Sequence, residues 1–175
     1  MKAPKILALV FALSYFNVNS QIYYPAPDNY DENDPKTHLY DDGKGNVITW
    51  DKLPKYKQDI QLINFSPYKP LSLAILNKIG FAKQPTILYF YSPFCGACKP
   101  VTPEIEKLKK GKTKVIMMNQ DGDNTELYGF FKKQIQYLPT IWFIKADGTY
   151  KQLIGGDEGG EETIFKINNF VKGIY

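Results

Sequence analysis

Arginine is absent from the sequence, so all 22 basic side chains of this 175-residue chain are lysines, set against 18 acidic residues. Proteins that bind nucleic acid favour arginine forks and a clustered basic patch. Here the lysines are scattered, apart from two groups that we interpret as helix ends and solvated faces: Lys107, Lys109, Lys110, Lys112 and Lys114, and Lys132 with Lys133. Despite the formal net charge of +4, we therefore expect no nucleic-acid partner.

Histidine and cysteine are also scarce. The chain has one histidine, His38, and two cysteines, Cys95 and Cys98. A zinc site needs about four ligands, which these three residues cannot supply within one chain. A cysteine hydrolase needs a histidine base, and a surface role suits His38 better. We therefore expect no metal site and no cofactor, and any chemistry of the cysteines falls to the pair itself.

Long apolar runs are missing as well, and one short run stands near the start. A basic segment, Met1–Lys5, is followed by the apolar stretch Ile6–Phe16, which is too short for a comfortable membrane span. Val18-Asn19-Ser20 then places small or modest residues where signal peptidase reads. These features predict a signal peptide over 1–20 and an exported protein, periplasmic or secreted, with no stable membrane span after cleavage. An uncleaved anchor is the alternative.

The segment 21–65 predicts a partly irregular N-terminal extension. Its acidic, proline-interrupted beginning is typical of irregular structure. Turn residues over 41–46 separate Leu39-Tyr40 from Val47–Trp50, which predicts a small hairpin. Trp50 either anchors this extension onto the main domain or faces a partner.

From Ser66 onward the pattern becomes regular. Ser66-Pro67 is suited to start a helix whose inner face carries Leu71, Ile75 and Ile79. Apolar runs predict strands, and amphipathic runs predict helices, in the order α-β-α-β-α-β-β-α. The strands are expected over 86–91, 115–118, 141–144 and 150–154, and the later helices over 101–110, about 125–133 and about 161–172. This order predicts an α/β domain over 66–175, with a central mixed β-sheet flanked by helices.

The stretch Ser92–Pro100 stands where the strand over 86–91 gives way to a helix. Two cysteines separated by two residues at such a junction form a redox motif. Cys95 is expected at the helix N-terminus, where unpaired N–H groups and the helix dipole favour a thiolate. Cys98 lies about one turn further, less exposed and close enough to form a disulfide. A second landmark is Pro139, just before a buried strand, where we predict a cis Leu138–Pro139 bond.

These landmarks make residues 70–175 resemble the thioredoxin family. The resemblance rests on the motif Phe94–Lys99, on Pro103 inside the following helix, and on Leu138-Pro139-Thr140. The short spacing between Cys98 and Pro139 resembles plain thioredoxin and leaves no room for the large helical insertion of the strongly oxidising periplasmic enzymes. The resemblance does not extend to 21–65.

The resemblance implies a thioredoxin-like fold and a protein thiol–disulfide oxidoreductase, acting as a monomer on protein thiols or disulfides together with a redox partner protein. It implies catalytic roles for Cys95 and Cys98. It assigns the partner-binding surface to Phe94, Leu138 and Pro139. The residues expected to tune the redox pair are Gly96, Ala97, Lys99 and Tyr89.

Three positions depart from the family pattern. Tyr89 stands where thioredoxins have a buried aspartate, Ala97 replaces the motif proline, and Phe94 replaces a tryptophan. A tyrosine, with a pKa near 10, moves protons poorly at neutral pH. We therefore expect a protein that differs from a general reductant. Because the Cys95 thiolate is expected at a helix N-terminus beside Lys99, with no buried acid to oppose it, we expect the pair to be more oxidising than thioredoxin but weaker than the strongest periplasmic oxidases. The alternative is a non-enzymatic binding module that keeps the fold and a structural disulfide.

Overall fold

The computed structural model describes residues 29–41, 44, 46–122, 125–155 and 160–174. The predicted signal peptide therefore lies outside the described residues. The chain divides into two compact units, Met1–Gln58 and Asp59–Tyr175. Helix α1 (Lys55–Asn64) crosses the boundary between them in sequence.

The first unit contains the predicted hairpin. Tyr40 pairs with Ile48 in antiparallel register, and the Tyr40 ring contacts Trp50 with centroids 6.2 Å apart. The Tyr40 hydroxyl donates a hydrogen bond to the Pro35 carbonyl. Trp50 therefore packs against the hairpin of its own unit. The elements are η2 (Pro35–Thr37), β1 (Tyr40–Asp41), β2 (Val47–Ile48) and η3 (Trp50–Lys52), where η marks a 3-10 helix.

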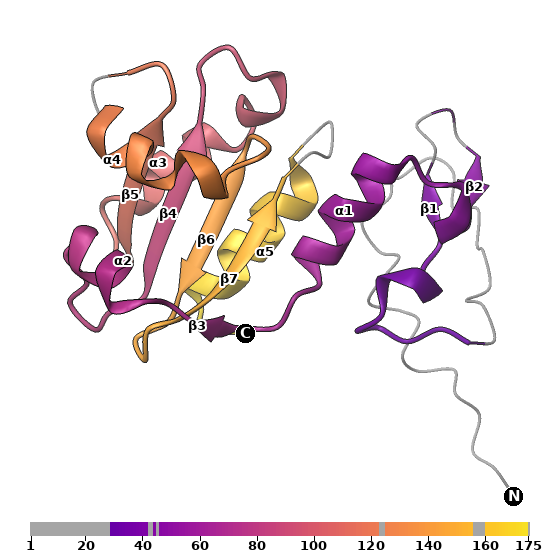
Figure 1. Cartoon of the computed structure of the whole chain (residues 1–175), viewed down its shortest axis with the longest axis horizontal. Coiled ribbons are helices and arrows are strands. Elements are labelled where there is room, and N and C mark those ends of the chain that lie inside the picture. The colour runs from indigo at the N-terminus through magenta and orange to yellow at the C-terminus, as the bar shows by residue number, and fades with distance from the viewer. Residues whose placement is uncertain (1–28, 42–43, 45, 123–124, 156–159, 175) are drawn as a thin grey trace, which may run out of the picture. The chain divides into compact units, whose positions relative to one another are not determined.

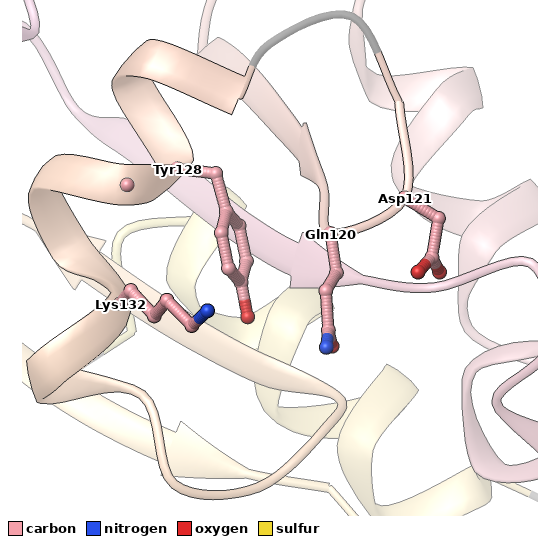
Figure 2. A pocket seen from close by; sticks show the side chains of 5 residues that line it. Gln120, Asp121, Tyr128 and Lys132 are labelled. Atoms are coloured by element: carbon pink, nitrogen blue, oxygen red, sulfur yellow. The ribbon is translucent and has the colours of Figure 1, made fainter.

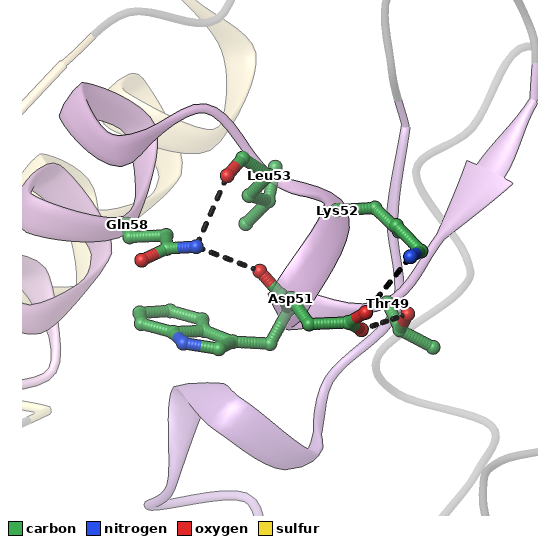
Figure 3. Close-up of polar contacts among 6 residues, drawn as sticks. Thr49, Asp51, Lys52, Leu53 and Gln58 are labelled. Atoms are coloured by element: carbon green, nitrogen blue, oxygen red, sulfur yellow. Dashed lines mark hydrogen bonds and ion pairs between the residues drawn. The ribbon is translucent and has the colours of Figure 1, made fainter.

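Short-range polar contacts connect η3 to the start of α1 (Figure 3). The Gln58 amide donates from Nε2 to the carbonyls of Trp50 and Leu53, each at 3.0 Å. The Thr49 hydroxyl donates to Asp51 Oδ1 at 2.5 Å. The Trp50 carbonyl also accepts the Leu53 N–H at 3.1 Å, so the Gln58 amide adds a second bond to it and binds the end of η3 to α1.

The second unit is built on a five-stranded sheet with the order β3-β7-β6-β4-β5. Strands β4 and β5 are parallel, and the other neighbouring pairs are antiparallel. The sheet is therefore mixed, as predicted. Its strands are β3 (Lys69–Pro70), β4 (Thr86–Tyr91), β5 (Lys114–Asn119), β6 (Thr140–Ile144) and β7 (Thr149–Ile154).

Helices cover both faces of this sheet (Figure 1). They are α2 (Leu73–Lys78), α3 (Thr102–Leu108), α4 (Thr125–Phe131) and α5 (Glu161–Val171). Side chains alternate across a strand, so Leu88 and Phe90 of β4 face one side and Ile87 and Tyr89 the other. The first pair packs with residues of α2 and α4, and we call this cluster the α2–α4 core. The second pair packs with residues of α3 and α5, which form the α3–α5 core.

The predicted helix start at Ser66-Pro67 is wrong. Helix α2 begins at Leu73, after Ser72, whose hydroxyl accepts the Ile75 N–H at 3.4 Å. Pro70 explains the difference, because it lacks an N–H and could not continue a helix that began at Pro67. Together with Lys69, it instead forms β3 on the edge of the sheet, next to β7.

Candidate active site

The sheet brings the two sequence landmarks to one end. Phe90 near the end of β4 is opposite Thr140 at the start of β6. The cysteine motif follows β4, and Leu138-Pro139 precedes β6, so both loops lie at the same end of neighbouring strands. The Leu138–Pro139 bond is cis, which confirms the prediction. Pro139 is buried.

The two cysteines form a disulfide, with their Cα atoms 5.2 Å apart. Cys95 stands at the N-cap of η4 (Gly96–Cys98), and the Cys98 N–H donates to its carbonyl at 3.1 Å. Cys95 is partly exposed, whereas Cys98 is only 1% exposed. The pair is therefore asymmetric, with an accessible first sulfur at a helical N-terminus and a buried second one. The turn after Cys95 is 3-10, and the α-helix itself begins at Thr102.

A buried serine ties the motif loop to the end of β5. Ser92 is 8% exposed, and its hydroxyl donates to Asp121 Oδ2 at 2.5 Å. Ser92 Oγ also accepts the Phe94 N–H at 3.1 Å, and the Ser92 carbonyl accepts the Cys95 N–H at 3.1 Å. Sequence reasoning did not single out Ser92 or Asp121 as a pair, because no local pattern links positions 29 residues apart.

Tyr89 occupies the inner wall of the site. It is fully buried, and its hydroxyl lies 2.9 Å from Thr102 Oγ1 and 3.3 Å from the Cys98 carbonyl oxygen. Thr102 in turn donates to the Cys98 carbonyl at 2.8 Å. Burial raises the pKa of Tyr89 to about 12, so the phenol is neutral and acts as a hydrogen-bond donor. Sequence reasoning missed Thr102, although it lies four residues after Cys98, one helical turn away.

Two shallow hollows lie near the motif. One, of about 280 Å³, is lined by Tyr91, Ser92, Pro93, Cys98, Lys99, Thr102 and Pro103. The other, of about 250 Å³, lies beside Asp121 and is lined by Gln120, Asp121, Tyr128, Gly129 and Lys132 (Figure 2). Burial, and secondarily the Asp121 charge, raises the pKa of Tyr128. The first hollow gives the buried second cysteine an opening to its surroundings.

The other residues predicted to act at the site differ in exposure. Phe94 is 85% exposed, the most exposed large apolar side chain among the described residues. Gly96 and Lys99 are also exposed, and an added Cβ at Gly96 would meet no atom within 4 Å. Leu138 packs against the α2–α4 core. Their roles in binding and tuning stay predictions, as does that of Ala97.

No group of three or more histidine, cysteine, aspartate or glutamate side chains is placed to hold a metal ion among the described residues. Nor does any helix described here have the length and apolar character needed to cross a membrane.

Comparison with known proteins places this site in a family context. A sequence model described as thioredoxin matches residues 74–168. The thioredoxin of Borreliella burgdorferi is 37% identical over 73 residues, which cover 41% of this chain and 62% of the relative. Thioredoxin 2 of Plasmodium berghei is 34% identical over 113 residues, which cover 63% of each protein. The chain spans between 21% and 63% of the length of the curated relatives it matches.

Solved structures with a similar chain path include thioredoxin O1 of Arabidopsis thaliana in its oxidised state. It is 23% identical, with a TM-score of 0.44, over 57% of this chain and 88% of that one. A secreted disulfide oxidoreductase of Mycobacterium tuberculosis is 15% identical, with a TM-score of 0.42, over 54% of this chain and 85% of that one.

Proposed function

The matched residues 74–168 make up more than half of the chain, which therefore belongs to the thioredoxin family, and we propose that it is an exported thiol–disulfide oxidoreductase acting on partner proteins. One observation supports this most strongly. Cys95 and Cys98 form a disulfide whose first sulfur belongs to a partly exposed residue at a helical N-terminus, and whose second belongs to a buried one. A two-step exchange needs one accessible cysteine that attacks the partner and a second cysteine that releases it, and this asymmetry fits both roles.

The first step joins the reduced protein to its partner. The Cys95 thiolate attacks one sulfur of the partner disulfide, so that a Cys95–partner S–S bond forms and the partner's own S–S bond breaks. The second partner sulfur leaves as a thiolate and takes up a proton. Cys95 suits this step because the N–H groups of the following turn stabilise its negative charge.

The second step releases the partner. Cys98 loses its proton and attacks the Cys95 sulfur, so the Cys95–Cys98 bond forms and the first partner sulfur departs as a thiolate. Two electrons have then passed from the cysteine pair to the partner, and a reduced redox partner restores the dithiol. Run in reverse, the same steps oxidise a partner dithiol. Tyr89 cannot accept the Cys98 proton near neutral pH, because its pKa is about 12. The Cys98 proton passes instead to water or to the departing partner thiolate, and Cys98 and Thr102 both line the hollow beside the motif.

Partner binding is assigned to the surface around the first cysteine. Phe94 offers an exposed aromatic ring beside Cys95, and its burial against a partner would remove apolar area from water. The family resemblance assigns the backbone at Leu138 and Pro139 to holding the partner's extended chain. Pro139 is buried, and its carbonyl accepts the Gly155 N–H at 3.0 Å, which supports a fixed backbone at this place.

Trapping experiments test the unequal roles of the cysteines. Cys98→Ala should accumulate stable mixed disulfides through Cys95, because the second step cannot occur. Cys95→Ala should trap few partners or none, and the double variant is the background control. Non-reducing electrophoresis followed by mass spectrometry measures the adducts. Equal trapping by the two single variants, or by neither, would contradict the mechanism.

Export is proposed from the first 20 residues alone, where a basic start precedes a short apolar run. An oxidising compartment also suits a paired cysteine motif. The mature protein is then expected to begin at Gln21, and the intact mass of the exported protein measures this directly. A mass that still includes Met1–Ser20 would show that the segment is retained as an anchor.

A further inference from the structure

Asn64, the last residue of α1, is bound to the sheet far from it in sequence. It is 8% exposed, and its Nδ2 donates to the Ile154 carbonyl at 2.9 Å. The Ile154 N–H donates back to Asn64 Oδ1 at 2.6 Å. In the described residues, β3 pairs with β7 at Thr149 and Tyr150 alone. At Ile154 the asparagine amide therefore satisfies the backbone groups that a neighbouring strand would otherwise pair.

These bonds reach the cis-proline segment through one peptide group. Ile154 turns its N–H and C=O toward Asn64, and the next N–H, that of Gly155, donates to the Pro139 carbonyl at 3.0 Å. The Ile154 carbonyl and the Gly155 N–H belong to the same planar peptide unit. Asn64 therefore binds the carbonyl of this peptide unit, and the Pro139 carbonyl binds its N–H.

Close packing makes this connection stiff. A Cβ added at Gly155 would lie 3.1 Å from Pro139 Cγ and 2.8 Å from Thr163 Oγ1. Both separations are shorter than ordinary van der Waals contact, so the Gly155 backbone already touches the proline ring and its surroundings. A shift of the Ile154–Gly155 peptide cannot be absorbed there and moves the Pro139 segment instead.

We propose that Asn64 is a positioning residue for Leu138-Pro139 and therefore sets how well a partner protein is captured. The proposal rests on the proposed function, since it assumes that this segment binds the partner's chain. It assigns a role to the last turn of α1, a helix that precedes the region matched by the thioredoxin family. Asn64 touches neither sulfur, so its effect is expected in binding and not in the exchange chemistry.

The test compares a protein substrate with a small one. Asn64→Ala removes both bonds, whereas Asn64→Asp at neutral pH keeps an acceptor for the Ile154 N–H and loses the donor to the Ile154 carbonyl. Both variants should raise KM for dithiothreitol-driven insulin reduction about fivefold, with little change in kcat. The reaction of the pre-reduced protein with 5,5′-dithiobis(2-nitrobenzoate), which needs no extended binding site, should keep its rate constant. Gln61→Ala, on the same helix, is the matched control and should leave both reactions unchanged.

The outcomes separate the two proposals. A wild-type protein that reduces neither substrate refutes the proposed function and, with it, this role of Asn64. An active wild type whose Asn64 variants keep the normal KM for insulin, or lose both reactions equally, refutes the positioning role alone. Gly155→Ala perturbs the same peptide unit on the side that faces Pro139, and it should reproduce the selective rise in KM for insulin. If Asn64→Ala fails to fold, Asn64→Asp and Gly155→Ala decide the question by the same two assays.

Discussion

The side chains on the two faces of strand β4 lie in different environments. On one face, Phe90 packs with Phe131 and Trp142, whose rings meet edge to face at 5.4 Å and 85°. On the other, Tyr89 points a hydroxyl at Thr102 and at the Cys98 carbonyl. Both faces carry a buried core, but only the face of Tyr89 also places a hydroxyl beside the cysteine motif.

The polar atoms of the two faces show the same contrast. Trp142 Nε1 is the one buried side-chain nitrogen or oxygen without a hydrogen-bond partner among the described residues. The Tyr89 hydroxyl, by contrast, has two oxygen neighbours at the motif. An unpaired indole N–H is a cost that the burial of a large ring can outweigh. Among the described residues, the one unpaired buried polar atom thus lies in the α2–α4 core, whereas the Tyr89 hydroxyl on the opposite face is hydrogen-bonded.

Trp142→Ala should give the largest effect and confine it to stability. Loss of the buried ring should lower the free energy of unfolding by about 3–5 kcal/mol, measured by urea denaturation. The reduction potential of the Cys95–Cys98 pair should stay at the wild-type value. Trp142→Phe, which keeps a ring and removes the unpaired N–H, should cost much less. A change in the reduction potential of a folded Trp142 variant would contradict the claim that the α2–α4 core does not tune the cysteine pair.

Tyr89→Asp should change the reduction potential, in addition to the stability lost with a buried ring. A carboxylate at this position would oppose the Cys95 thiolate and so destabilise the reduced form. The reduction potential should fall by about 30 mV, which corresponds to about 1.4 kcal/mol for a two-electron couple. Tyr89→Phe, with no charge, is the control and should leave the potential within a few millivolts of the wild type. A potential in Tyr89→Asp equal to that of Tyr89→Phe would show that this face does not tune the pair.

The Tyr89 pKa gives a pH test of the same face. In the folded protein its pKa is about 12, above the value near 10 expected in the unfolded chain. The stabilisation is therefore fully present below pH 10 and is lost as the pH rises toward 12, because only the unfolded state then releases the proton. The stability of the wild type should fall more steeply over this range than that of Tyr89→Phe. Parallel curves for the two proteins would contradict the burial of the phenol.

Ser92→Ala should give the smallest effect, at the border of the site. Loss of the bond to the partly solvated Asp121 should cost about 1 kcal/mol in unfolding free energy. The Phe94 N–H also loses its acceptor, so its hydrogen exchange should become faster. Amides of the α2–α4 core provide the internal control and should keep their protection. Unchanged exchange at Phe94 would show that Ser92 does not hold the motif loop.

Much of the fold could be predicted because the signals were local. Apolar runs located the sheet strands from β4 onward, and the cysteine spacing together with Pro139 located the site. The start of α2 could not be predicted from Ser66 or Ser72 alone, because both can cap a helix. What decides between them is the pairing of β3 with Thr149 and Tyr150, almost 80 residues later.

The parts of the site that the sequence did not reveal depend on contacts between residues that are far apart in the chain. Asn64 meets Ile154 across 90 residues, and Ser92 meets Asp121 across 29. Neither pair has a periodic or motif signature, since each depends on where the sheet places its partner. Tyr89 was singled out by its position before Cys95, but the further rise of its pKa to about 12 follows from its burial, which the sequence alone does not show.

The reduction potential of Cys95–Cys98 tests the central claim most directly. Equilibration of the purified protein against graded glutathione buffers, with thioredoxin alongside, measures it. A thiolate stabilised at a helical N-terminus, with no buried acid to oppose it, should place the potential between about −270 mV, as for thioredoxin, and about −120 mV, as for the strongest oxidases. A potential below about −300 mV, the range of structural disulfides, would contradict a catalytic pair and favour a binding module that merely keeps the fold.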